Sequence, residues 1–184
     1  MIAGSAKGRR LKSVLGKGTR PALARVRAAV FNIAQSAVPD SRFLDLFAGT
    51  GAYGIEALSR GATSATFVDL DPRAVSVIRH NLRLCGLEGR AHVINADVLR
   101  AVDRLRKQGM CFDIIVVAPP YFRGLGPKTM ERIAGLGLLE PGGLCFVQHH
   151  EGEYMEPAFS DLSVVRRYSY GSNMLSLYRR GSPA

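Results

Sequence analysis

Short apolar runs alternate with helical stripes of apolar positions along most of the chain. Short, mostly apolar runs lie at 43–47, 65–69, 92–95, 114–117 and 144–148, as expected of strands that are covered on both faces. Between them, apolar residues recur every three or four positions, which predicts amphipathic helices. The helical stripes contain Ile55 and Leu58, then Val75, Ile78, Leu82 and Cys85, then Val98, Val102 and Leu105. This alternation predicts an α/β fold with a mostly parallel sheet, whose ligands bind at the carboxyl ends of the strands.

The two ends of the chain follow other patterns. After Pro21, apolar residues at helical spacing predict a helix that ends at Pro39; its apolar positions from Leu23 onward are Val26, Val30, Ile33 and Ala37. At the other end, strand-like runs at 163–170 and 174–179 are separated by Gly171-Ser172-Asn173. We therefore expect a C-terminal antiparallel hairpin.

Positive charge is concentrated at the amino end. The 184 residues include 25 Lys and Arg against 15 Asp and Glu, a net charge of +10, and eight of the basic residues but none of the acidic ones precede Asp40. Such a block attracts polyanions through phosphate neutralisation; a solvated tail is the plainer alternative. The candidate RNA-contacting residues are Lys7, Arg9, Arg10, Lys12, Arg20, Arg25 and Arg27.

Composition excludes several classes of protein. No apolar run approaches the roughly 18 residues that a membrane span needs, and the amino end carries no apolar signal segment. The three cysteines, Cys85, Cys111 and Cys145, form no CxxC pair, so the chain encodes neither a disulfide framework nor a zinc site of the usual form. We expect a cytoplasmic protein without a metal, and we favour a monomer.

Three glycines directly follow the first predicted strand. Gly49, Gly51 and Gly54 would allow a tight turn whose backbone N–H groups approach a ligand closely. Asp69 ends the second predicted strand, where a carboxylate commonly holds ribose hydroxyls. These features fit proteins that bind NAD as well as those that bind S-adenosylmethionine.

Asp45, inside the first predicted strand, favours S-adenosylmethionine. A carboxylate between Leu44 and Leu46 is costly unless paired, and it could meet the ammonium group of an amino-acid ligand. Asp97 could accept a hydrogen bond from the adenine amine or could simply cap the following helix. The candidate cofactor-binding residues are Asp45, Phe47, Ala48, Gly49, Thr50, Gly51, Gly54, Asp69, Leu70, Asp97 and Val98.

The fourth predicted strand ends in a stiff turn. Ala118, Pro119, Pro120 and Tyr121 follow it directly, and prolines there would hold carbonyl oxygens and an aromatic ring rigidly beside a cofactor. A flat base could stack on Tyr121 with its exocyclic amine near these acceptors. We take these four residues as the candidate catalytic segment.

Several longer motifs are spread nearly end to end along the chain, namely GSAKGRRL, Arg20-Pro21, the long run LDLFAGTGAYGIEALSRGA, FVDLD, HNL, NAD and PPY. With these motifs the chain resembles the RsmD family of bacterial 16S rRNA guanine-N2 methyltransferases. This resemblance implies a class I, Rossmann-like methyltransferase fold, S-adenosylmethionine as methyl donor with S-adenosylhomocysteine as product, and 16S rRNA or the small ribosomal subunit as partner. The charge block and the helix that ends at Pro39 predict a division into a basic extension with its helix, residues 1–39, and a catalytic domain, residues 40–184. The resemblance implies that the extension contacts the rRNA.

Two departures from the family pattern leave alternatives open. Ala118 stands where relatives usually carry Asp or Asn as an amine acceptor, and Ala22-Leu23-Ala24 replaces a Thr- and Asp-containing stretch. Losing one preorganised catalytic contact typically costs about 2.7–4 kcal/mol. A catalytically silent RNA-binding protein is therefore the second hypothesis. An NAD-dependent oxidoreductase, which the glycine pattern alone permits, is the third.

Overall fold

The computed structural model describes residues 1–14 and 21–181. The elements of this part are the helices α1 Pro21–Ile33, α2 Ala52–Ser59, α3 Pro72–Cys85, η1 Glu88–Arg90, α4 Val98–Lys107 and α5 Leu125–Leu136, and the strands β1 Arg42–Leu46, β2 Ser64–Asp69, β3 Ala91–Asn95, β4 Phe112–Val117, β5 Leu139–His150, β6 Ala158–Phe159, β7 Leu162–Tyr170 and β8 Asn173–Arg180. None of the described helices is long and apolar enough to cross a membrane.

The eight strands within the described residues form a single sheet in the order β3-β2-β1-β4-β5-β8-β7-β6. The first five are parallel to one another, whereas β8 pairs antiparallel with both β5 and β7. The carboxyl ends of β1, β2 and β4 therefore meet at one edge, where ligands of such sheets bind.

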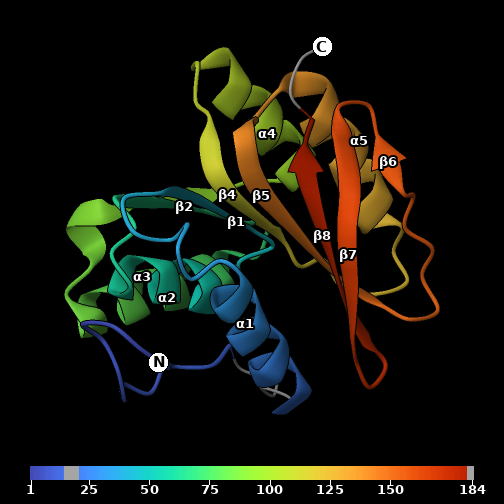
Figure 1. Cartoon of the computed structure of the whole chain (residues 1–184). Coiled ribbons are helices and arrows are strands. Elements are labelled where there is room, and N and C mark those ends of the chain that lie inside the picture. The colour runs from blue at the N-terminus through green and yellow to red at the C-terminus, as the bar shows by residue number, and fades with distance from the viewer. Residues whose placement is uncertain (15–20, 182–184) are drawn as a thin grey trace.

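Helices cover both faces of this sheet (Figure 1). On one face, α1, α2 and α3 enclose a core that includes Val30, Phe31, Ile55 and Ile78. On the other face, α4 and α5 pack against a second core around Val102 and other residues of that side. Two apolar layers explain why the central strands carry apolar residues on both faces over most of their length.

The architecture predicted from the sequence is confirmed, and two helices differ from expectation. Helix α1 ends at Ile33 rather than at Pro39. The segment after the helix still buries an apolar residue, Val38, completely. Apolar residues beyond Ile33 therefore reflect burial and not further helix. Helix α5 was not predicted, because Gly126, Pro127 and Gly135 obscure its pattern.

The first residues of the chain pack against α2 and α3. The amides of Ile2 and Ala3 donate to the buried carboxylate of Glu56 at 2.8 and 2.9 Å, and Ala6 belongs to the core beneath α2. The Asn81 side chain also bonds the backbone of Lys12. The division into residues 1–39 and 40–184 stays a prediction.

Candidate active site

The loop between β1 and α2 is shaped by glycines. Gly49 and Gly51 have φ values of 59° and 76°, a left-handed conformation that favours glycine. Gly54 lies in the first turn of α2, where an added Cβ would come within 2.3 Å of the Phe67 ring. The loop can therefore hold its backbone close to a ligand, and the predicted glycines are required for different physical reasons.

Asp69 is tied to this loop. One carboxylate oxygen accepts from the Gly49 amide at 2.7 Å, and the other accepts from the Asp71 amide at 2.9 Å. Asn95 donates to the backbone oxygens of Asp69 and Leu70, which fixes the end of β2. Each Asp69 oxygen retains a second lone pair for a ligand hydroxyl.

Asp45 is fully buried, and one of its oxygens is unused. Its Oδ2 accepts from the Gly54 amide at 3.0 Å, while Oδ1 has no hydrogen-bond partner among the described residues. Burial raises the pKa of Asp45 to about 8, and the charge of Arg27 acts in the opposite direction. Arg27 Nε is likewise buried and has no partner in the described part of the chain. An unsatisfied acceptor and an unsatisfied donor thus lie within electrostatic reach of each other.

At the start of α4, only one carboxylate oxygen of Asp97 is available to a ligand. Asp97 caps this helix, because its Oδ1 accepts from the Arg100 amide at 3.1 Å, as one of its two predicted roles requires. Its other carboxylate oxygen remains available for the predicted adenine contact. Leu70, two-thirds exposed, lies at the same edge of the sheet and could cover a bound ring.

A chain of hydrogen bonds fixes the Pro-Pro-Tyr turn. The Tyr121 hydroxyl donates to Asn173 Oδ1 at 2.6 Å and accepts from Gln148 Nε2 at 2.7 Å. The Tyr53 hydroxyl donates to Gln148 Oε1 at 2.9 Å. This hydroxyl-amide chain joins α2, β5, β8 and the turn. The sequence analysis did not identify Tyr53, Gln148 and Asn173. The available signal in the sequence was Gln148, a polar residue in an otherwise apolar predicted strand.

The two predicted parts of the site come together around Tyr53. Burial raises the pKa of Tyr53, and the charges of Asp45, Arg27 and Tyr121 also act on it. Ala118 packs against the core on the α1–α3 face of the sheet, which is the face that carries Asp45 and Gln148 by strand alternation. The Ala118 methyl group therefore lies where a longer side chain would reach the site.

The predicted RNA-contacting residues fall into two groups. Side chains of Lys7, Arg9, Arg10 and Lys12 are exposed, as is Arg25 on α1. Arg9 donates to the Leu84 carbonyl. Arg27, in contrast, is half-buried at the site, and Arg20 lies outside the described residues.

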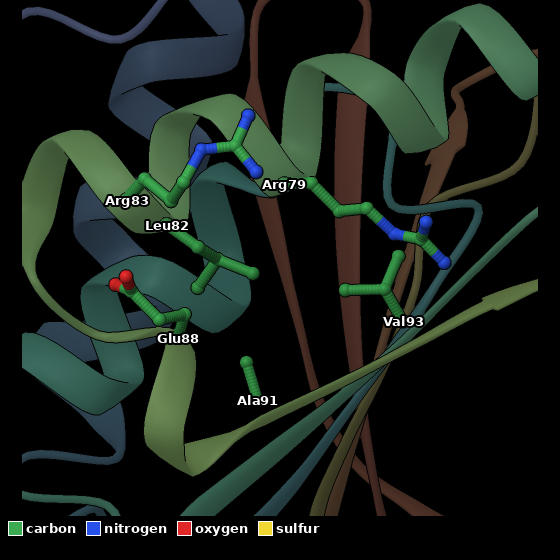
Figure 2. A pocket seen from close by; sticks show the side chains of 6 residues that line it. All are labelled: Arg79, Leu82, Arg83, Glu88, Ala91 and Val93. Carbon is green, nitrogen blue, oxygen red and sulfur yellow. The ribbon is translucent and has the colours of Figure 1, made fainter.

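A surface hollow of about 320 Å³ lies elsewhere, between α3 and the edge strand β3. Figure 2 shows its lining, which consists of Arg79, Leu82, Arg83, Glu88, Ala91 and Val93. Ala91 begins β3, so the hollow reaches the amino end of that strand. None of the predicted site residues lines it, and the chemistry described above lies at the carboxyl ends.

A family model described as Conserved hypothetical protein 95 matches residues 1–179 of this chain. Ribosomal RNA small subunit methyltransferase D of Escherichia coli K12 is 32% identical over 180 residues, which cover 98% of this chain and 89% of that protein. The chain belongs to the RsmD family.

Solved structures of similar proteins have the same fold. The RsmD-family chain resembles the Escherichia coli protein yhhF with a TM-score of 0.84 and 32% identity, covering 100% of this chain and 98% of that one. A hypothetical protein of Thermus thermophilus gives a TM-score of 0.82 and 34% identity, covering 96% of each chain. The predicted fold class and family are thereby confirmed.

Proposed function

We propose that this protein methylates the exocyclic N2 amine of a guanine in 16S rRNA, with S-adenosylmethionine as the methyl donor. The observation that carries the cofactor assignment is the unused oxygen of buried Asp45 beside the glycine loop. A buried acceptor without a partner is unfavourable unless a ligand satisfies it. The guanine, the 16S rRNA and a cytoplasmic setting follow from membership of the family.

The residues present fit an amino-acid-bearing nucleoside. Asp45 would accept from the ammonium group, and Arg27 Nε would donate to the carboxylate. Asp69 would accept from ribose hydroxyls, while the free oxygen of Asp97 would accept from the adenine amine. When bound, S-adenosylmethionine supplies a methyl group on a positively charged sulfur.

The Pro-Pro-Tyr turn would position the base. Tyr121 offers its ring for stacking, and its hydroxyl is fixed by Gln148 and Asn173. Backbone carbonyl oxygens of the turn would orient the amine, because the Ala118 methyl group cannot accept a hydrogen bond. Alignment and exclusion of water would supply most of the rate enhancement, with the amine proton leaving after methyl transfer.

Membership of the family favours the methyltransferase over the two alternatives. Ala118 is the main support for a silent RNA-binding protein, whereas a relative aligned over 98% of this chain bears a methyltransferase name. The glycine pattern alone motivated an NAD-dependent oxidoreductase. It does not account for the family match over residues 1–179.

The direct test is methyl incorporation from radiolabelled S-adenosylmethionine. Unmodified 16S rRNA and small subunits from cells that lack the endogenous family member are the substrates, and mass spectrometry of nuclease fragments locates the product. We expect N2-methylguanine at a single position. Binding of S-adenosylhomocysteine without incorporation into either substrate would favour the silent protein.

Two variants make this test specific. Tyr121→Ala removes the proposed stacking ring and should abolish incorporation while leaving cofactor binding intact. Leu84→Ala changes an exposed apolar residue on α3, away from the carboxyl ends of the strands, and should leave both measurements unchanged.

A further inference from the structure

Phe122, which follows the Pro-Pro-Tyr turn, is unusual in both exposure and backbone conformation. Its residue surface is 66% exposed, and its φ value is 58°. The left-handed region is costly for a bulky residue and is kept only where its surroundings enforce it. An exposed ring of this kind adds little to the core, so the strain has no evident benefit for folding.

Glu153 enforces this conformation. Its Oε1 accepts from the Phe122 amide at 2.8 Å, and its Oε2 accepts from the His150 amide at 3.0 Å. One carboxylate therefore joins the turn after β4 to the end of β5. The Gly152 amide also donates to His150 Nδ1 at 3.0 Å, which fixes the imidazole.

The three rings at this place form a row. The centroids of Phe122 and His150 lie 4.7 Å apart, and those of His150 and Tyr121 lie 5.9 Å apart. A Cβ at Gly152 would lie 3.7 Å from the Phe122 ring. The inner side of Phe122 thus rests on His150 and Gly152, while the remainder of the ring is open to solvent.

The residue beside Phe122 supplies a positive charge. Arg123 is exposed, and no described acidic residue forms an ion pair with it. An open aromatic ring next to a cation is the combination by which proteins hold single-stranded nucleic acid, through base stacking and phosphate attraction. A buried protein interface would instead surround the ring with other apolar side chains.

We propose that Phe122 is a stacking platform for the nucleobase that adjoins the target nucleotide, with Arg123 contacting the intervening phosphate. This inference rests on the proposed function, because Tyr121, at the inner end of the row, is there assigned to the target base. His150 supports Phe122 from beneath, and Glu153 holds the ring in its exposed position. The partner is RNA that is single-stranded at the methylated guanine and at the one nucleotide next to it.

The test compares Phe122→Gly, Phe122→Ala and Phe122→Trp with Leu84→Ala in the full-length protein. Equilibrium binding of a naked 16S rRNA fragment, measured with S-adenosylhomocysteine present, is the main readout. Loss of one base stack is expected to weaken binding about tenfold in the glycine and alanine variants. The tryptophan variant should bind within about twofold of the unaltered protein.

Two further measurements separate stacking from a structural role. Phe122→Gly removes the conformational strain, so its melting temperature should be no lower than that of the unaltered protein, although its RNA affinity falls. The affinity for S-adenosylhomocysteine should be equal in all variants. RNA affinity unchanged in Phe122→Gly and Phe122→Ala, or a loss seen only with assembled subunits, would overturn the proposal.

This binding test does not depend on turnover. If the unaltered protein fails to methylate RNA, the proposed function is wrong, while the affinities of the variants still decide the role of Phe122. If the unaltered protein methylates RNA and the variants match it in both affinity and kcat/KM, only the stacking proposal fails.

Discussion

The site has a cofactor half, formed by the glycine loop with Asp45 and Arg27, and a base half, formed by the Pro-Pro-Tyr turn and its hydrogen-bond partners. The two halves differ in whether their buried polar atoms have hydrogen-bond partners. Beside the glycine loop, Asp45 Oδ1 and Arg27 Nε are buried without partners among the described residues. Around the Pro-Pro-Tyr turn, the Tyr53, Gln148, Tyr121 and Asn173 side chains bond one another. A buried polar atom without a partner indicates which donor or acceptor a ligand must supply. A buried side chain whose polar atoms are all hydrogen-bonded is instead held in a fixed position.

Ala118 is the position in the base half where a substitution should have the largest effect. Ala118→Asp adds an acceptor on the face that carries Asp45, and it should raise kcat by about 10²–10³, the usual value of one preorganised contact. Steady-state methylation of 16S rRNA measures the change. Ala118→Asn should give a similar gain and Ala118→Leu none; equal rates in all three would mean that backbone carbonyls already suffice.

Asp45→Asn tests the cofactor half and should have the next largest effect. The amide keeps the shape but loses the charge that the ammonium group needs, so the affinity for S-adenosylhomocysteine should fall by about 10- to 100-fold. Isothermal calorimetry measures this affinity. Asp71→Asn is a matched control at the same edge of the sheet. An equal loss of affinity in Asp71→Asn would mean that the negative charge of this edge as a whole, and not a contact of Asp45, attracts the ligand.

Tyr121→Phe breaks the hydroxyl-amide chain without removing the ring. Gln148 and Asn173 are at most 9% exposed, and leaving them unsatisfied should lower the free energy of unfolding by about 2 kcal/mol. Urea unfolding measures the change, and cofactor affinity should not move. Tyr154→Phe is the matched control, because Tyr154 is 71% exposed and its hydroxyl bonds only at the surface.

The pKa of Asp45 predicts a smaller effect of pH on cofactor binding. In the free protein this carboxyl keeps its proton below about pH 8, whereas an ammonium group favours the ionised form. Affinity should therefore rise with pH, by up to about tenfold per unit, and level off above pH 8. Calorimetry at pH 7 in buffers of different ionisation enthalpy should reveal proton release, which Asp45→Asn should abolish.

The same group has the opposite effect on stability. Its pKa in the folded state, about 8, lies above the ordinary value of 3.8 for an aspartate, so the folded protein binds more protons between these values. The contribution to stability is full below the lower value and is lost as pH rises towards 8. Urea unfolding as a function of pH should show this decline in the unaltered protein and a smaller one in Asp45→Asn.

The features predictable from the sequence were those encoded locally. The apolar runs, the glycines after β1 and the Pro-Pro-Tyr turn each depend on neighbouring residues, and the structure places them as expected. The hydroxyl-amide chain could not be predicted, because it joins Tyr53 to a residue 95 positions away and Tyr121 to one 52 positions away. Arg27 was grouped with the RNA-contacting residues since charge alone does not show which side of α1 is buried.

The position of β8 has a consequence for how the protein is made. β8 follows every other strand in the chain, yet it lies between β5 and β7 (Figure 1). During synthesis, β5 and β7 therefore each keep an unpaired edge until the region after residue 172 has left the ribosome. A chain that stopped before Asn173 would expose both edges to aggregation and would also lack the acceptor of the Tyr121 hydroxyl. Pairing of β8 with β5 and β7 thus completes both the sheet and the base half of the site.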